Sequence, residues 1–215
     1  MPYRTTPFIK NNFYHIYNRG VEKRKIFIDE GDHLRFIQTL QYYQFSGPKP
    51  RFSTHHRFKI KDFSNNPKIV EIICYCLMPN HFHLLLKQVK EKGIQEFSSK
   101  VLNSYTKYFN TKNRRIGPLL QGQFKAVPVE NDEQLLHLSR YIHLNPFVSE
   151  LSKYRENFPF SSFAEFISSS NNSICVKEYI LDFYKNPQDY RSFVKNHASY
   201  AKDLEKIKHL LIDDD

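Results

Sequence analysis

Tryptophan is absent from the 215-residue chain, and cysteine is scarce, with three residues. Cys74, Cys76 and Cys175 form neither an even-numbered set nor a CxxC pair, which argues against a disulfide framework and against a zinc or redox motif of that type. The chain also lacks any apolar run near the roughly 20 residues that cross a membrane, and it shows no basic-then-apolar leader. A protein that works in a reducing cytoplasm, without a membrane partner, is therefore expected.

Positive charge is abundant, and it is unevenly distributed. Lys and Arg number 32 against 22 Asp and Glu, for a net charge of +10. Residues 1–130 hold 22 basic and 9 acidic side chains, whereas residues 131–215 hold 10 and 13. An excess of this kind suits a partner rich in phosphate, such as a nucleic acid. For any single lysine, a solvated surface that only aids solubility is the alternative.

Hydrophobic periodicity divides the front part of the chain into alternating strands and helices. The expected strands are 13–18, 69–78, 81–87 and 124–129, and the expected helices are 29–45, 94–109 and 131–145. The basic stretch 46–66 is expected to be a loop with room for a short strand at 58–60. This order predicts an α+β fold, in which an antiparallel sheet carries helices on one or both faces.

His81 and His83 stand on either side of Phe82 in an apolar stretch that follows Pro79-Asn80. Alternate side chains of a strand share one face, so both imidazoles are expected to project the same way. Two imidazoles that converge on one point form half of a divalent-metal site. Two polar residues on the solvated face of a half-buried sheet are the alternative, and the spacing alone does not decide.

Helix 131–145 is well bounded in the sequence. Asn131 suits the N-cap, Gln134 completes a capping box three residues later, and Pro146 is expected to stop the helix. These signals predict where the helix begins and ends.

One side of this helix carries a second half-site. His137, Tyr141 and Asn145 are spaced i, i+4 and i+8, which places them close to one side. An Asn oxygen is a hard ligand suited to Mg²⁺ or Mn²⁺, and imidazole accepts Mn²⁺ well. A tyrosine that packs at the edge of the core is the ordinary alternative.

A tyrosine beside a metal has one distinctive use. Its hydroxyl is a poor nucleophile at a pKa of ~10, but it can attack a phosphodiester that a divalent ion polarises. The products are a covalent phosphotyrosine and a 3′ hydroxyl, and the strand can be rejoined without ATP. A basic, aromatic-rich surface around such a site would suit single-stranded DNA.

Five segments, in order, resemble one protein family. His81-Phe82-His83 resembles the HUH motif of single-tyrosine (Y1) transposases of the IS200/IS605 type. The full set resembles their REP-associated tyrosine transposase branch and covers residues 13 to about 165. Its segments are 13–20, 76–83, 117–125, 140–146 and 158–163.

The resemblance implies a ferredoxin-like antiparallel sheet with packed helices, one of which presents the tyrosine. It implies that His81, His83 and Asn145 bind Mg²⁺ or Mn²⁺ and that Tyr141 is the nucleophile. The implied substrate is single-stranded or hairpin DNA with palindromic repeats. IS200-type relatives work as homodimers, whereas the extra C-terminal region of this chain favours a monomer, so both states stay open.

Other residues are assigned from their positions. Tyr105 and Tyr108 lack an Asn four residues on, and Tyr14 and Tyr17 suit packing or stacking in the first strand. His137 shares the side of Tyr141 and could contact a phosphate, but a surface position is the expectation for it, and His143 has no assigned role. Contacts to DNA are expected from Arg19, Lys23, Arg24, Arg114, Arg115, Gln121 and Lys125, with a solvated loop as the alternative.

The chain changes character after the family segments. A Ser/Asn-rich linker at 168–173 precedes amphipathic stretches at 176–184 and 189–211, and an acidic run ends the sequence at 213–215. We therefore expect a transposase-like domain at 1–165 and a helical C-terminal extension at 166–215. The acidic balance of the extension argues against a role in gripping DNA.

Two other functions fit the same residues. A protein of this fold that has lost catalysis would bind hairpin DNA in a way that ignores metal removal and the loss of Tyr141. A phosphoesterase of another kind would use the histidines to activate water, and it would hydrolyse its substrate without a covalent adduct.

Overall fold

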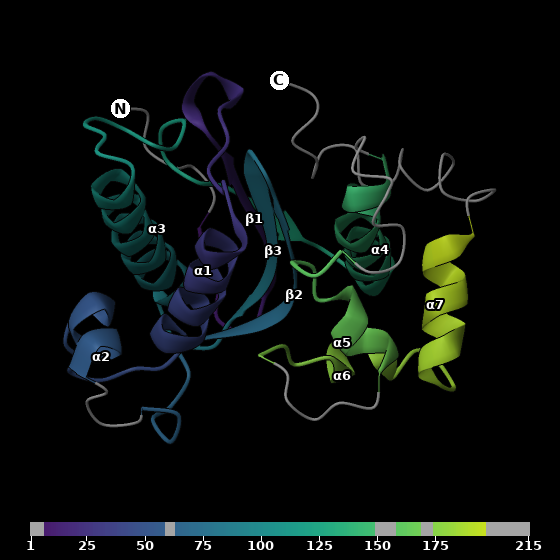
Figure 1. Ribbon diagram of the computed structural model, residues 1–215. Coiled ribbons are helices and arrows are strands. Elements are labelled where there is room, and N and C mark those ends of the chain that lie inside the picture. The colour runs from purple at the N-terminus through teal and green to yellow at the C-terminus, as the bar shows by residue number, and fades with distance from the viewer. Residues whose placement is uncertain (1–6, 59–62, 149–157, 169–173, 197–215) are drawn as a thin grey trace.

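A four-stranded antiparallel sheet runs through the middle of the molecule in the computed structural model, which describes residues 7–58, 63–148, 158–168 and 174–196 (Figure 1). Its strands lie in the order β2-β3-β1-β4. They are β1 (Phe13–Arg19), β2 (Val70–Met78), β3 (His81–Gln88) and β4 (Lys125–Val129).

The connections between strands complete a ferredoxin-like fold. The helix α1 (Glu30–Tyr43) joins β1 to β2, and α3 (Gly93–Lys112) joins β3 to β4. This β-α-β-β-α-β order with antiparallel neighbours is the arrangement that the sequence predicted.

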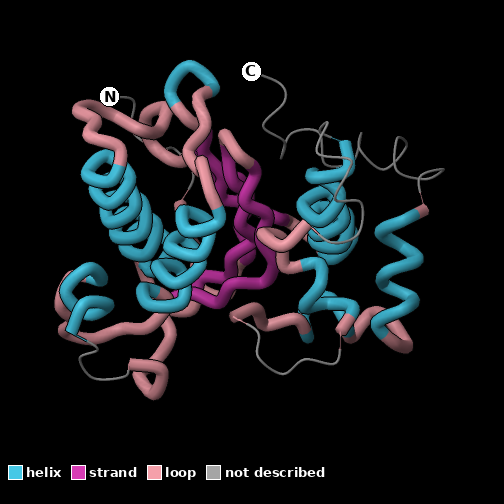
Figure 2. Tube along the Cα trace, in the orientation of Figure 1, coloured by secondary structure: helices cyan, strands magenta, loops and turns pink. Residues whose placement is uncertain are grey.

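Helices cover both faces of the sheet (Figures 1 and 2). On one side lie α1, α3 and the short α2 (Phe52–Phe58). On the other side lie α4 (Asp132–Val148), α5 (Phe163–Ile167), α6 (Glu178–Leu181) and α7 (Pro187–Lys195). A 3-10 turn, η1 (Val21–Lys23), follows β1.

The layer of α1 and α3 packs through aromatic rings. Phe36 of α1 lies 5.2 Å from Phe82 of β3 and 4.9 Å from Tyr105 of α3, measured between ring centroids. All three side chains are buried. Leu34 of α1 is 47% exposed and lies outside this packed face.

Helix α4 begins as predicted and ends later. Asn131 Oδ1 accepts from the Gln134 backbone N–H at 2.9 Å, and Gln134 Oε1 accepts from the Glu130 backbone N–H at 3.0 Å. Pro146 lies inside the helix, which continues to Val148, so the expectation that this proline stops it was wrong. Proline removes one helical hydrogen bond and its ring crowds the carbonyl four residues earlier, which can kink a helix without ending it.

The basic stretch 46–66 also differs from the prediction. Residues 52–58 form α2 rather than a loop, and Phe58 belongs to this helix rather than to a strand. Phe52 is the buried residue that anchors it, with its ring 5.2 Å from that of Tyr42. One buried anchor in a short polar segment gives little periodicity, which is why the helix was missed.

The C-terminal segments pack on α4 and on the outer edge of β2. Leu77 donates its backbone N–H to the Phe160 carbonyl at 2.9 Å, and Val176 donates to Ile72 at 2.8 Å. Fully buried Arg140 of α4 donates to the Asn196 carbonyl and lies over the ring of Phe193, 4.9 Å from its centroid. These contacts cover an edge that would otherwise be open to pairing.

The predicted helices at 176–184 and 189–211 correspond to α6 and α7 within the described residues. Residues 169–173, most of the predicted linker, lie outside the described ranges, as do 197–215 with the acidic run. The domain boundary at residue 165 stays a prediction. No helix in the described ranges is long and apolar enough to cross a membrane.

Candidate active site

The two histidines lie on the same face of β3, as the strand pattern predicted. In the strand register His83 stands between Tyr17 of β1 and Cys76 of β2, and His81 stands between Arg19 and Met78. His83 is fully buried and His81 is half-buried. The alternative of a solvated polar pair is therefore wrong for His83.

Asn145 of α4 lies between the two imidazoles. Its Oδ1 is 3.3 Å from His81 Nε2, and its Nδ2 is 3.3 Å from His83 Nε2. The helix that packs on this face thus delivers its amide to the point where the histidines converge. Strand and helix are joined here across 62 and 64 residues of sequence.

The chemistry of these three groups fits a divalent cation. His81 Nδ1 lies 2.7 Å from Asn80 Oδ1, an atom that only accepts, so in the neutral ring Nδ1 carries the proton and Nε2 presents a lone pair. That lone pair faces the Asn145 oxygen, which is also an acceptor. A cation bound between the imidazole nitrogen and the amide oxygen would remove the repulsion between their lone pairs.

The donor set is two imidazoles and an amide oxygen. Among the described residues no cluster of three His, Cys, Asp or Glu side chains could hold a metal. Burial lowers the pKa of His83 well below its usual value, and the charges of His81 and His15 add to this shift. His83 is therefore neutral, as a metal ligand must be.

His15 supports His83 from β1. Its Nε2 is 3.0 Å from His83 Nδ1, and both rings are fully buried and stacked with centroids 5.2 Å apart. If His83 Nε2 is to present a lone pair, its Nδ1 carries the proton and donates to His15. Such a partner fixes the tautomer and the ring orientation of a ligand histidine. Sequence reasoning missed this residue.

Two tyrosines border the histidines. The ring of Tyr141 lies edge-on to His83, with centroids 5.4 Å apart, and it is 4% exposed. The ring of Tyr17 lies 6.2 Å from His83 and is 5% exposed. Tyr141 is four residues from Asn145 on the same helix, whereas Tyr17 lies on the strand beside the histidines. The sequence assigned Tyr17 to packing or stacking. The structure thus places it near the site as a second tyrosine.

Three of the expected DNA-binding residues lie at the edge of this site. Arg19 pairs in register with His81, and its Nε donates to Gln121 Oε1 at 2.7 Å. Lys125 pairs in register with Tyr17, and its amine lies 6.0 Å from the centroid of that ring. Gln121 and Lys125 are exposed, so polar groups are available to a ligand at this edge.

Lys23 ends the η1 turn and Arg24 follows it, and this turn packs against the turn that precedes His81. Gly20 donates its N–H to the Asn80 carbonyl at 2.8 Å, and Asn80 Nδ2 donates to the Lys23 carbonyl at 3.4 Å. A Cβ on Gly20 would lie 2.2 Å from the Arg24 carbonyl oxygen, so glycine is needed for this close turn. Arg24 is bound to Glu22 at 3.0 Å, whereas the Lys23 side chain is exposed.

Arg114 and Arg115 lie farther along, on the loop after α3. Arg115 donates to Asn110 Oδ1 at 2.8 Å, which ties it to its own loop, and Arg114 is exposed with a φ of 50°.

The other histidines of α4 face away from the site. His137 lies against Phe193 of α7, with centroids 5.7 Å apart, so it does not share the environment of Tyr141. His143 is fully buried, with Nδ1 2.7 Å from the Tyr190 hydroxyl and Nε2 2.8 Å from Ser162 Oγ. Tyr190 and Ser162 belong to the C-terminal segments, so these segments cover this side of α4 and enclose His143.

Comparison with known families and structures agrees with this geometry. Residues 51–145 match the sequence model of a family described as "Transposase IS200 like". That range contains His81, His83, Tyr141 and Asn145. No curated protein matches the chain.

The fold matches that of a solved REP-associated tyrosine transposase bound to a REP hairpin. The TM-score is 0.54 at 15% identity, and the match covers 81% of this chain and 90% of the other. A Deinococcus radiodurans protein assigned as a transposase matches at a TM-score of 0.38 and 13% identity, covering 66% of this chain and 95% of the other. A TM-score of that size does not establish a shared fold. The predicted resemblance to the IS200-like transposases is confirmed by the family match over residues 51–145 and by the fold shared with a REP-associated tyrosine transposase.

Proposed function

We propose that this protein is a metal-dependent endonuclease and strand transferase that acts on single-stranded DNA through Tyr141. The observation that carries the proposal is the position of the Asn145 amide, 3.3 Å from both His81 Nε2 and His83 Nε2. On the same helix, the Tyr141 ring lies against His83. The nucleophile and the ligands thus all come from strand β3 and helix α4, which pack against each other.

His81, His83 and Asn145 would hold Mg²⁺ or Mn²⁺, since imidazole nitrogen and amide oxygen suit these ions. The ion, when bound, would polarise the scissile phosphate and stabilise the charge that develops on it. His15 contacts Nδ1 of His83 and Asn80 contacts Nδ1 of His81, so each partner orients one ligand ring. This preorganisation keeps the ligands from having to rearrange when substrate arrives.

The covalent step is a transesterification. The Tyr141 oxygen bonds to phosphorus while the bond from phosphorus to the 3′ oxygen breaks, and the hydroxyl proton passes to solvent. The departing 3′ oxygen takes up a proton and leaves as a hydroxyl. One phosphate ester replaces another, so no external energy source is needed, and attack by a 3′ hydroxyl reverses the step.

Hairpin or palindromic-repeat DNA is the proposed substrate. The solved REP-associated tyrosine transposase of the same fold is bound to a REP hairpin, and Arg19, Gln121 and Lys125 offer polar groups at the edge of the site. The histidines, the tyrosine and the amide all come from one chain, so a second copy is not needed to complete the site. A homodimer stays an expectation from the resemblance.

The test is covalent capture of a labelled hairpin oligonucleotide, read as a shifted band on a denaturing gel. We expect an adduct with Mg²⁺ or Mn²⁺ and none with EDTA. Hairpin binding that ignores EDTA and gives no adduct would instead support a catalytically inactive DNA-binding protein. Hydrolysis with turnover and no adduct would support a phosphoesterase that activates water.

A further inference from the structure

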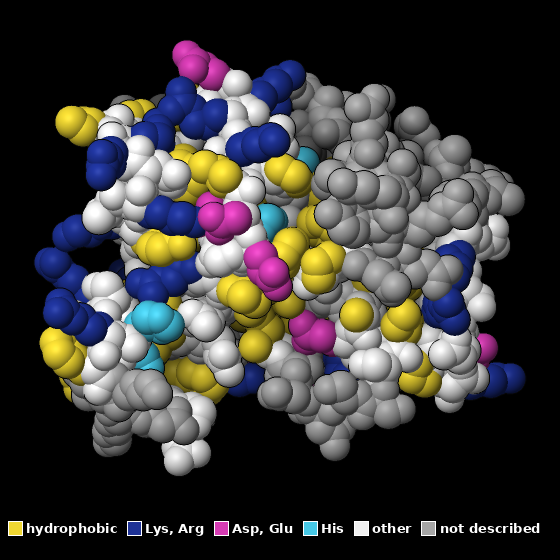
Figure 3. All heavy atoms as spheres, in the orientation of Figure 1, with side chains coloured by type: hydrophobic (Ala, Val, Ile, Leu, Met, Phe, Trp, Pro, Cys, Tyr) yellow, Lys and Arg dark blue, Asp and Glu magenta, His cyan; other side chains and the backbone are white. Residues whose placement is uncertain are grey.

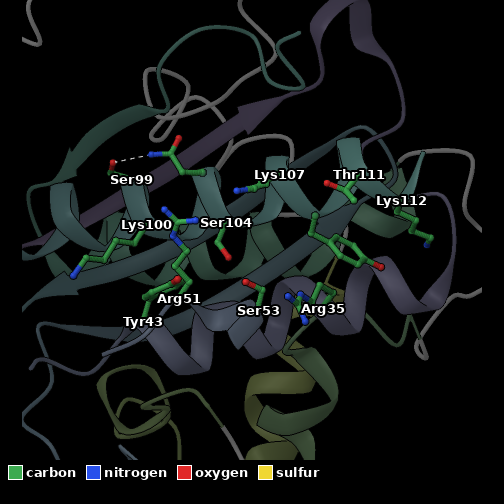
Figure 4. Close-up of a pocket in the computed structure, with 12 residues that line it drawn as sticks. Arg35, Tyr43, Arg51, Ser53, Ser99, Lys100, Ser104, Lys107, Thr111 and Lys112 are labelled. Atoms are coloured by element: carbon green, nitrogen blue, oxygen red, sulfur yellow. Dashed lines mark hydrogen bonds between the residues drawn. The ribbon is translucent and has the colours of Figure 1, made fainter. Parts of the chain in front are cut away.

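A cavity of about 720 Å³ lies between α1, α2 and α3, on the opposite side of the sheet from the histidines (Figures 1 and 4). A water molecule takes about 30 Å³ of liquid volume, so this cavity admits a ligand of many atoms. The family resemblance assigned no role to its lining. Its five basic side chains are Arg35, Arg51, Lys100, Lys107 and Lys112, and the lining contains no Asp or Glu.

Only some of these charges are neutralised by neighbours. Lys112 lies 2.6 Å from an Asp32 oxygen, and Lys100 lies 2.7 Å from a Glu96 oxygen. Within the described ranges, Arg35, Arg51 and Lys107 have no ion pair. The cavity therefore keeps an excess of positive charge that an anionic ligand would balance.

Arg35 is held in a geometry suited to an anion. Its guanidinium lies between two rings, 4.4 Å from the centroid of Phe52 and 5.1 Å from that of Tyr108. Its buried Nε has no hydrogen-bond partner within the described part of the chain. A guanidinium stacked in this way keeps its N–H edge fixed, which matches the oxygens of a phosphate.

The polar groups form a line along α3. Lys100, Ser104, Lys107 and Thr111 are spaced by four, three and four residues, which places them along one side of the helix. Figure 4 shows Ser104, Lys107 and Thr111 on one side of the hollow and Arg35 and Ser53 across from them. The line is about 16 Å long at a rise of 1.5 Å per residue.

That length discriminates between classes of anion. A strand of B-DNA carries one phosphate about every 3.4 Å along its axis, so about five phosphates lie beside a line of this size. One phosphate ion or one nucleotide would leave most of it uncontacted. The rings of Tyr43 and Tyr108 also line the cavity and offer stacking surface to bases or sugars.

The cavity is continuous with a wider basic surface. Figure 3 shows Lys and Arg side chains gathered over the side of the molecule where α2 and α3 lie and around the turn above them. Basic side chains therefore extend beyond the lining itself.

We infer that the groove between α2 and α3 binds the phosphate backbone of a nucleic-acid strand, as a second contact separate from the Tyr141 site. The inference rests on the proposed function only in taking DNA as the polyanion. DNA that is cut on one face of the sheet would be held on the other by Arg35, Arg51 and Lys107.

The first test compares salt dependence of binding. Anisotropy of a labelled single-stranded oligonucleotide is measured in EDTA against salt concentration, for the wild type and for Arg51→Gln/Lys107→Gln. Both positions are exposed, so folding should persist. Each phosphate contact with a single strand contributes about 0.7 to the magnitude of the slope of log K against log salt. Removal of two basic side chains should therefore lower that magnitude by about 1.4. The charge-matched control, Lys10→Gln/Lys185→Gln, should retain most of the wild-type slope.

An equal loss in the control would overturn the inference, because it would show a general charge effect. An unchanged slope in Arg51→Gln/Lys107→Gln would overturn it directly. ATP or inorganic phosphate that binds tightly in the wild type but not in this variant, with oligonucleotide binding unaffected, would assign the groove to a small phosphate ligand instead.

The second test locates the strand. The three native cysteines are buried, so a photoreactive thiol reagent can be attached selectively to Ser104→Cys in the groove. Ser192→Cys on α7, in the opposite layer, is the control. Crosslinking to DNA is expected at 104 and not at 192, and equal crosslinking at both would contradict the inference. A missing Tyr141 adduct in every variant would sink the proposed function alone and leave both groove readouts intact.

Discussion

His15 Nε2 lies 3.0 Å from His83 Nδ1, and both rings are fully buried between the sheet and α4. The pair joins two strands whose histidines are 68 residues apart in the sequence. When His15 Nε2 accepts from His83 Nδ1–H, His83 Nε2 presents its lone pair toward Asn145. The contact is thus a positioning interaction for a proposed metal ligand.

Replacement of His15 should weaken metal binding without removing a ligand. In His15→Leu the acceptor for His83 Nδ1–H is lost, and Mn²⁺ affinity should fall by about 10- to 100-fold. His15→Gln keeps an acceptor and should lose less. The readout is free Mn²⁺ by electron paramagnetic resonance. Equal affinities in the wild type and His15→Leu would remove His15 from the account.

Asn145 should be required for metal binding itself. Asn145→Ala removes the amide oxygen that lies between the histidines as a proposed metal ligand. The Mn²⁺ affinity should therefore fall by at least about tenfold. Asn145→Asp keeps an oxygen donor and adds a negative charge, so it should bind Mn²⁺ at least as well as the wild type. Calorimetric titration separates the two variants, and an Asn145→Ala protein with unchanged affinity would refute the ligand assignment.

The C-terminal segments should stabilise α4 through a buried polar network. Tyr190→Phe leaves His143 Nδ1 without its hydroxyl partner and also breaks the 3.1 Å bond to Ser139 Oγ. The free energy of unfolding should fall by about 1 to 3 kcal/mol, as measured by denaturant titration. Tyr184→Phe is the control, because that hydroxyl makes no hydrogen bond among the described residues. An equal loss in both variants would argue against the network.

Stability should fall as pH drops through the ordinary range of histidine. Burial lowers the pKa of His33, and this outweighs its hydrogen bond to the Asp29 carbonyl. Near the usual pKa of ~6.5 the unfolded chain therefore binds more protons than the folded one, so acid favours unfolding. His33→Gln should flatten the pH dependence of the free energy of unfolding between about pH 7.5 and 5.5. An unaltered pH dependence would show that His33 titrates normally.

The sequence predicted the fold and the main residues of the site because both depend on local patterns. Alternation in β3 placed His81 and His83 on one face, and helical spacing placed Tyr141 near Asn145. His15 could not be found in this way, because its contact depends on the pairing of β1 with β3. A histidine two residues before Tyr17 in an alternating strand was the only available signal.

Other errors have similar causes. Helix α2 has one buried anchor, Phe52, and so shows no clear apolar stripe. His143 had no assigned role, because nothing in α4 itself indicates that Tyr190 and Ser162 would cover it. The basic groove likewise joins Arg35, Arg51 and Lys107 from segments whose packing the sequence did not show.

The position of the covalent bond tests the central claim most directly, because two tyrosines border the histidines. The adduct with a labelled hairpin would be digested with protease, and the peptide that carries the nucleotide would be sequenced by mass spectrometry. The account predicts that the label is on Tyr141, that Tyr141→Phe gives no adduct while it folds normally, and that Tyr17→Phe still gives one. A label on Tyr17, or an unchanged adduct in Tyr141→Phe, would contradict it.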